Sequence, residues 1–390
     1  MVTVEHPLQA FDPRNYMPGE LRGSGPWRFD ALNLDGARSL SGQRQQKPQF
    51  LRAPLAQLQR GTLQLRSLVQ FLEFPVRAFL RERIGYYTPA QAERLSDSIP
   101  LDLDALEGWA LGDRLLSALF AGSSTDEALA AERGRGLLPL GQLGEQALQN
   151  TLAEVASLFL AAQKTAAFGE VAMPMEVNVE LPDGRFLVGT VPGVRSGTIT
   201  RCTFSKLRPK QRLQAWAHLL ALSAAHPELA PSSVTIGRLE SSKKDAPRNC
   251  TQLLPPLAGD LGSLRQAAIQ KLSALVDLYD RGMREPIPLY CATSAAWAEA
   301  ARSEAGAGPK AAAEGAWGAG TNRGNRGFGE AFDPEHVLVL GEVLAFDRVL
   351  EELPRGDEAG PGWPTAQSRF GRLAVRLWHP LLEHEKLEVG

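Results

Sequence analysis

The sequence predicts an α/β (α+β) fold in which a central sheet is flanked by helices. The strongest indication is the stretch 185–226, where side chains alternate in Phe186–Val191 and again in Gly197–Phe204, as in the two strands of a hairpin. Apolar residues at helical spacing follow Pro209, and proline suits the first position of a helix. Long amphipathic patterns before and after this stretch supply the flanking helices.

The elements before the hairpin are an arm and a set of helices. Residues 1–50 show little periodicity and many prolines and glycines, so we expect an extended N-terminal arm. A helical pattern begins near Leu51, and Pro75 should end one helix and open the next. Further helices are predicted over Leu103–Phe120 and Leu140–Gln163, the second being the longest uninterrupted helical pattern.

Around and after the hairpin the pattern predicts more strands and then helices. Strands are expected over Met175–Leu181, which a turn joins to the hairpin, and over Val234–Leu239. Amphipathic helices are expected over Ser263–Arg284 and Arg369–Glu385. Alanine and glycine dominate the segment 306–329, where we expect a flexible stretch.

Length and composition limit the classes of function. The chain has 390 residues, 44% of them hydrophobic, so it can bury a large core. We expect two parts, the arm at 1–50 and one domain over 51–390. The formal net charge is −2, which excludes binding of nucleic acid through a global positive field and leaves only local basic surfaces. Three cysteines lie far apart with no C-x-x-C pair, which favours reduced thiols over a zinc site.

The sequence also bears on localisation. No apolar run is long enough for a membrane helix, and the N-terminus lacks the regions of a signal peptide. We therefore expect a cytoplasmic protein with no membrane partner. Prolines at positions 7, 13 and 18 give the chain an extended beginning, from which we expect that Met1 is not the natural start and that the chain is part of a longer one.

The strand, strand, helix order resembles the catalytic centre of a large nuclease group, the restriction-endonuclease-like or PD-(D/E)xK type, with its chemistry removed. In that group the first strand ends in Gly-x-x-Asp, and the second carries Asp/Glu-x-Lys before a helix that bears glutamine. Here Pro192 stands at the aspartate and Phe204 at the second carboxylate, while Lys206 and Gln214 are retained. Magnesium needs carboxylate oxygens. The resemblance thus implies a nuclease fold with a degraded site, no catalytic residue and no metal.

One acidic residue remains near the expected site. Active relatives start the long helix with Gly-x-x-x-His, and Glu145 stands at the histidine here. A carboxylate in the first turn also suits the helix dipole. The alternative is an active magnesium nuclease whose carboxylates have moved to Glu145, Glu176, Glu180 and Asp183, which would require two of them to converge beside Lys206.

Positive charge replaces negative charge around the hairpin. No Asp or Glu occurs between Gly184 and Pro227, whereas seven Lys and Arg do. Such cations can lie along a phosphate backbone, and a solvated face or a subunit interface is the alternative. The candidates for DNA contact are Arg195, Arg201, Lys206, Arg208, Lys210 and Arg212.

Two helices carry further residues with alternative roles. Arg77, Arg81 and Arg83 follow Pro75 and belong either to a solvated face or to a phosphate contact. Trp216 lies on the apolar stripe of the helix after the hairpin. It is predicted to be a core residue, with a base-stacking tryptophan at the surface as the competing interpretation.

Five segments of the chain are similar to segments in the C-terminal third of the gamma subunit of exodeoxyribonuclease V, which defines the RecC family. They occur in the same order in both. The resemblance implies a subunit of the RecBCD helicase–nuclease, which processes duplex ends for recombinational repair, with RecB, RecD and DNA as partners. It also implies no working ATPase or nuclease centre and no cofactor in this chain, since ATP and magnesium are used by partner subunits. The segments are PLQAFDPRNYMPG, LVQFLEFPVRAFLRERIG, LDALEGWALGDRLLSALF, LLPLGQLGEQALQ and FGEAFDPEHVLVLGE.

Three functions remain open at this point. The first is a non-catalytic domain that guides DNA and scaffolds a repair complex in double-strand break processing. The second is the active nuclease with relocated carboxylates. The third is an adaptor that contacts only protein. The first two functions differ in one structural feature. An active nuclease requires acidic side chains beside Lys206, and a non-catalytic domain does not.

Overall fold

The computed structural model describes residues 3–42, 49–58, 61–87, 102–169, 171–239, 248–303, 308–318 and 329–390. The chain divides into two compact units, Met1–Gln49 and Phe50–Gly390. Within the described residues, no helix is both long and apolar enough to cross a lipid bilayer.

The first unit contains a short 3-10 helix, η1 (Pro13–Asn15), and an α-helix, α1 (Ala31–Ser41). Asp30 caps α1, because its carboxylate accepts a hydrogen bond of 3.0 Å from the backbone N–H of Asn33. The residues of α1 are therefore helical, and the expectation of an extended arm is corrected for them. Only Ala37 of this helix is buried, so the sequence carries no apolar stripe from which the helix could be predicted.

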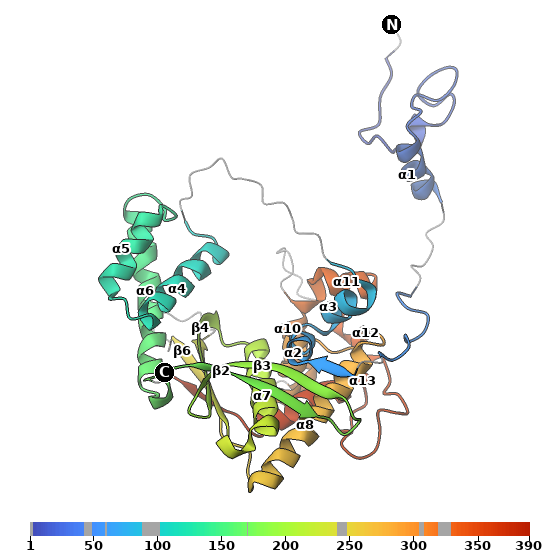
Figure 1. Ribbon diagram of the computed structural model, residues 1–390. Helices are drawn as coiled ribbons and strands as arrows, with labels where there is room; N and C mark the ends of the chain where they lie inside the picture. The colour runs from blue at the N-terminus through green and yellow to red at the C-terminus, as the bar shows by residue number, and fades with distance from the viewer. Residues whose placement is uncertain are drawn as a thin grey trace. The chain divides into compact units, whose positions relative to one another are not determined.

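The second unit is built on a mixed sheet of seven strands within the described part of the chain (Figure 1). Their order is β1-β3-β4-β5-β6-β7, with β2 paired to β3. β2, β3 and β4 are consecutive and antiparallel, β5 runs parallel to β4, and β1 runs parallel to β3. The strands are β1 (Thr62–Gln64), β2 (Met173–Glu180), β3 (Phe186–Arg195), β4 (Thr198–Lys206), β5 (Ser232–Arg238), β6 (Asn249–Leu254) and β7 (Lys386–Val389).

Helices flank this sheet, so the predicted α/β architecture is confirmed. Pro75 separates two helices as predicted, since it occupies the first position of α3. The predicted long helices are present with ends shifted by a few residues. The α-helices are α2 (Leu65–Glu73), α3 (Pro75–Phe79), α4 (Ala105–Phe120), α5 (Thr125–Arg135), α6 (Gln142–Gln163), α7 (Pro209–Ala225), α8 (Leu261–Gly282), α9 (Cys291–Arg302), α10 (Gly308–Trp317), α11 (Pro334–Leu340), α12 (Phe346–Leu350) and α13 (Arg369–Leu382). There is also a short π-helix, η2 (Leu80–Ile84), and there are short 3-10 helices, η3 (Ala166–Gly169), η4 (Pro227–Leu229) and η5 (Glu330–Phe332).

The predicted hairpin is formed by β3 and β4. Ser196 and Gly197 connect the strands with φ angles of 42° and 82°, and two-residue hairpin turns of this kind need positive φ at both positions. The β2–β3 register shifts between the pairs Met173–Val194 and Met175–Val191. Pro192 lies in this bulge, where a residue without a backbone N–H is tolerated.

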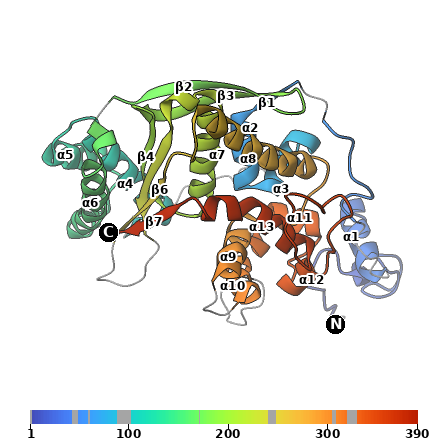
Figure 2. The same ribbon diagram turned by 90° about the horizontal axis from the view of Figure 1, so that it is seen from below.

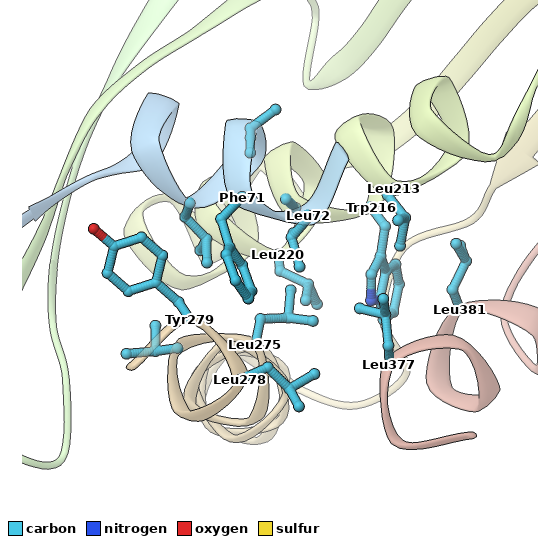
Figure 3. Packing of buried hydrophobic residues seen from close by; sticks show 14 of the residues in the cluster. Phe71, Leu72, Leu213, Trp216, Leu220, Leu275, Leu278, Tyr279, Leu377 and Leu381 are labelled. Carbon is cyan, nitrogen blue, oxygen red and sulfur yellow. The ribbon is translucent and has the colours of Figure 1, made fainter. Parts of the chain in front are cut away.

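Two hydrophobic clusters lie on the two sides of β4 and β5, with α4 and α6 on one side and α7 on the other (Figure 2). In the larger cluster, α7 packs against α8 and α13 (Figure 3), and Trp216 is only 1% exposed. The smaller cluster joins α4 and α6 to Phe204 of β4 and Ile236 of β5. Trp216 is therefore a core residue, as predicted.

The segment 306–329, expected to be flexible, includes helix α10. Alanine has the highest helix propensity, and Trp317 at the end of α10 is fully buried. Its indole Nε1 donates a hydrogen bond of 2.7 Å to the carbonyl oxygen of Leu344. This tertiary contact corrects the composition-based expectation over Gly308–Trp317, while positions 306, 307 and 319–328 lie outside the described residues.

Candidate functional site

Phe204 occupies the position at which the nuclease resemblance places the second carboxylate. The side chain is only 2% exposed. Its ring packs against α4 so closely that a Cβ at Gly112 would lie 2.1 Å from the ring. On another side the guanidinium carbon of Arg238 lies 4.1 Å from the ring centroid. This position therefore holds an aromatic core residue and offers no oxygen to a metal ion.

Arg238 and Glu154 complete this arrangement. Arg238 ends β5 and pairs in register with Lys206 of the parallel strand β4. Its Nη1 donates a hydrogen bond of 2.6 Å to Oε2 of Glu154 on α6. The buried Nε of Arg238 has no acceptor among the described residues. Together, Phe204, Arg238 and Glu154 are named the Phe204 cluster below.

The sequence did not point to Glu154 or Arg238 as site residues. Their approach depends on the parallel pairing of β4 with β5, and the register of that pairing shifts between Cys202 and Lys206. A strand pattern alone contains neither the pairing nor the shift. The one available signal is that Glu154 directly precedes Val155, a buried residue of α6, which places its stem at the edge of the packed face.

The other positions of the nuclease motif do not lie in the Phe204 cluster. Pro192 is exposed in the β2–β3 bulge. Lys206 is half-buried at the end of β4. Gln214 lies on α7, and its Oε1 accepts a hydrogen bond from Nη1 of Arg201. The retained glutamine is thus engaged on the α7 side of the sheet, whereas the Phe204 cluster lies on the α6 side.

Glu145 lies in the first turn of α6 and faces α5. Oε1 of Glu145 accepts a hydrogen bond of 2.7 Å from Arg133 and one of 3.0 Å from Gln149. These bonds lower the pKa of Glu145 to about 2. Glu154, the residue of α6 at the Phe204 cluster, comes nine residues later, about 13 Å further along the helix axis. Glu145 is thus part of an ion pair in the first turn of α6, where a carboxylate also suits the helix dipole.

The other carboxylates of the alternative nuclease hypothesis lie on separate elements. Glu176 and Glu180 are exposed on β2, which pairs with β3. Asp183 follows in the turn and accepts a hydrogen bond of 2.7 Å from Nε of Arg185. Over the described ranges, no three His, Cys, Asp or Glu side chains are grouped as a metal ion would require.

Arg212 is an interior residue, which corrects its prediction as a DNA contact. Its side chain is 8% exposed, and it forms ion pairs with Glu385 and Glu299. The guanidinium carbon also lies 5.3 Å from the ring centroid of Trp378. Reaching a phosphate would break these contacts. The sequence pattern could not show this, because Glu385 is 173 residues away.

Two more predicted cations lie on different sides of the sheet. Arg195 donates to Thr200 and lies 5.3 Å from the ring centroid of Phe168, next to α6. Arg201 points to α7, where it donates to Gln214. The structure therefore does not gather all the predicted cations on one face.

The remaining candidates are close together in the sequence. Lys206, Arg208 and Lys210 follow one another from the end of β4 into the first turn of α7. Nζ of Lys210 lies 5.9 Å from the ring centroid of Phe74, and the guanidinium carbon of Arg77 lies 4.5 Å from the same centroid. The basic strip, as it is called below, consists of Lys206, Arg208, Lys210, Phe74, Arg77 and Arg81.

A shallow pocket accompanies the basic strip. It has a volume of ≈ 200 Å³ and is lined in part by Glu73, Phe74, Arg77 and Arg81. Arg77 is held there by a hydrogen bond of 2.9 Å to Glu335. Burial raises the pKa of Glu73, an effect that the nearby Lys210 opposes. The strip thus combines cations, one aromatic ring and a partly desolvated carboxylate.

Replacing Gly112 by alanine is expected to lower the free energy of unfolding by about 1–3 kcal/mol. The added Cβ would overlap the Phe204 ring, which is itself held in place by Arg238. Gly108, one turn earlier on α4, has no atom within 4 Å of an added Cβ. Gly108→Ala should therefore stabilise the protein by up to about 1 kcal/mol through helix propensity. Urea unfolding followed by far-ultraviolet circular dichroism measures both, and equal effects would contradict the packing of Phe204 on α4.

The amino-acid sequence was compared with protein families and with known proteins. The sequence matches the family described as the RecC C-terminal domain over residues 60–302. Over 387 residues it is 36% identical to the RecBCD enzyme subunit RecC of Mycobacterium tuberculosis (strain H37Rv), an alignment that covers 98% of this chain and 33% of that protein.

Two further relatives have the same printed name. The chain is 36% identical over 388 residues to RecC of Mycolicibacterium smegmatis, covering 99% of this chain and 33% of that protein. It is 26% identical over 297 residues to RecC of Escherichia coli (strain K12), covering 76% of this chain and 24% of that protein. The chain thus spans about a third of the length of the mycobacterial relatives it matches.

Proposed function

This chain belongs to the RecC family, and from that premise we propose that it is a non-catalytic domain that guides DNA and scaffolds the RecBCD helicase–nuclease, exodeoxyribonuclease V, in double-strand break processing for recombinational repair. On this proposal its partners are the RecB and RecD subunits and DNA. It works without a cofactor of its own, because ATP and magnesium are used by the partner subunits.

The non-catalytic part of the proposal is supported by a poor fit to magnesium. The ion requires several oxygen ligands in near-octahedral geometry. Phe204 and Pro192 have no side-chain oxygen, and the carboxylate of Glu154 is engaged by Arg238. The strand, strand, helix order of β3, β4 and α7 supports a restriction-endonuclease-like, PD-(D/E)xK-type fold. Magnesium-dependent DNA cleavage that disappears in Lys206→Ala would contradict this part.

The observation that carries the DNA-guiding role is the basic strip. Arg208 and Lys210 are exposed at the start of α7, and lysine and arginine neutralise phosphates without reading sequence. Phe74 lies between Lys210 and Arg77, and an aromatic ring among cations suits a nucleic-acid strand whose bases can stack.

Replacing Lys206, Arg208 and Lys210 together by glutamine is expected to weaken DNA binding of the assembled complex and to flatten its salt dependence. Each lost phosphate contact should reduce the slope of log K against log salt by about 0.7 for a single strand and about 0.9 for a duplex. Sequence preference should not change. Binding titrations over a range of salt concentrations measure this.

The matched control replaces three exposed arginines of other elements by glutamine, Arg133 of α5, Arg265 of α8 and Arg302 of α9. It removes the same formal charge and should leave the slope unchanged. If the strip variant assembles normally and keeps the wild-type slope, the guiding role is ruled out. If it fails to assemble with the partner subunits, the strip is a protein interface and the adaptor function is favoured.

A further inference from the structure

We propose that the guanidinium of Arg238 permanently fills the space that a divalent cation would need beside β4, so that the Phe204 cluster is closed by an internal cation. The inference rests on the proposed function, because it takes Phe204 as the position of a lost metal-binding carboxylate. It goes further by stating what has taken the place of the ion and what excludes it.

In the Phe204 cluster, the guanidinium of Arg238 stands where a cation site would hold its ion. Arg238 presents its positive charge to the face of the Phe204 ring at 4.1 Å, where the ring quadrupole attracts a cation. On α6, Glu154 provides the negative charge through a hydrogen bond of 2.6 Å, which is charge-assisted. The carboxylate and the ring are thus both committed to one guanidinium.

The positive charge of the surroundings opposes a second cation. Lys206 is the register partner of Arg238 on the neighbouring strand, so two positive residues end β4 and β5 next to each other. A divalent ion here would meet like charge at short range. The ring itself is accommodated because residue 112 is glycine, where any Cβ would lie 2.1 Å from the ring.

This arrangement makes a specific claim about restoring the site. A carboxylate introduced by Phe204→Glu would lie within reach of Arg238 and form an ion pair with it. The new carboxylate would then be unavailable to a metal ion, just as Glu154 is now. Removing the guanidinium is therefore the step that opens the site, and adding a carboxylate alone is insufficient.

The test uses the full chain and manganese ion alone as the probe, with free manganese followed by electron paramagnetic resonance. The variants are Phe204→Glu and the double variant Phe204→Glu/Arg238→Ala, each checked for folding by circular dichroism. The double variant should bind manganese roughly tenfold or more tightly than Phe204→Glu, because a neighbouring positive charge has been removed. Equal binding by the two variants, or no binding by a folded double variant, overturns the inference.

A second variant keeps the test informative if glutamate at position 204 prevents folding. Arg238→Glu retains the Phe204 ring and places a carboxylate beside Glu154. It should bind manganese, and Arg238→Gln should not. Failure of folded Arg238→Glu to bind overturns the inference while leaving the salt test of the proposed function untouched. Manganese binding by the wild type that Glu154→Gln abolishes overturns both the inference and the non-catalytic assignment.

Discussion

Replacing Arg212 by alanine is expected to lower the free energy of unfolding by about 3–5 kcal/mol, the range for breaking a buried ion pair by removing one partner. Glu385 has a side chain only 5% exposed. It would lose its hydrogen bonds from Arg212, one of them 3.1 Å long, and would keep the bond of 2.8 Å from Gln252. A buried carboxylate would be left without a compensating positive charge. Equilibrium unfolding in urea measures the loss.

Two comparisons separate this structural role from contact with DNA. Lys210 is exposed two residues earlier on the same helix, and Lys210→Ala should change stability by no more than about 0.5 kcal/mol. Adding Glu385→Gln to Arg212→Ala should recover part of the stability, because the stranded charge is removed. If Arg212→Ala is as stable as the wild type and has a reduced salt slope for DNA, Arg212 belongs to the DNA interface instead.

The parts of the fold that could be predicted from the sequence are those whose cause is local. The hairpin turn needs positive φ at Ser196 and Gly197, and the sequence marks this with glycine between two alternating runs. Pro209 and Pro75 each begin a helix, because proline lacks the N–H that a first turn leaves unpaired anyway. The absence of a carboxylate at Pro192 and Phe204 is likewise read from the sequence alone.

The parts that could not be predicted depend on contacts between distant segments. β7 is only four residues long, too short for its alternation of polar and apolar residues to predict a strand, and it exists because it pairs with β6. The helix α10 is stabilised by the burial of Trp317, whose indole donates a hydrogen bond to the carbonyl oxygen of Leu344. In the candidate site, the partners of Arg212 and Arg238 come from other elements. The position of an arginine in the sequence therefore does not show whether it is exposed, as Arg208 is, or buried in ion pairs, as Arg212 is.

Replacing Trp216 by alanine is expected to destabilise the protein by about 3–5 kcal/mol, the usual range for removing a large aromatic side chain from a core. Trp216 is 1% exposed, and its ring lies between α7 and the leucines of α13 (Figure 3). The ring of His384 lies 5.3 Å away, and Nζ of Lys271 lies 5.9 Å from the indole. Urea unfolding followed by far-ultraviolet circular dichroism measures the change.

The control is a tryptophan at the surface. Trp109 on α4 is 37% exposed, and its Nε1 donates a hydrogen bond of 3.0 Å to Oγ of Ser205. Trp109→Ala should cost about 1–2 kcal/mol, because it removes one hydrogen bond and a partly buried ring. A base-stacking role for Trp216 predicts the reverse pattern, in which Trp216→Ala unfolds at the wild-type urea concentration but binds DNA more weakly. Since a ring buried between two helices cannot reach a base without unfolding, we expect Trp216→Ala to lose stability first, with any loss of DNA binding following from the unfolded fraction.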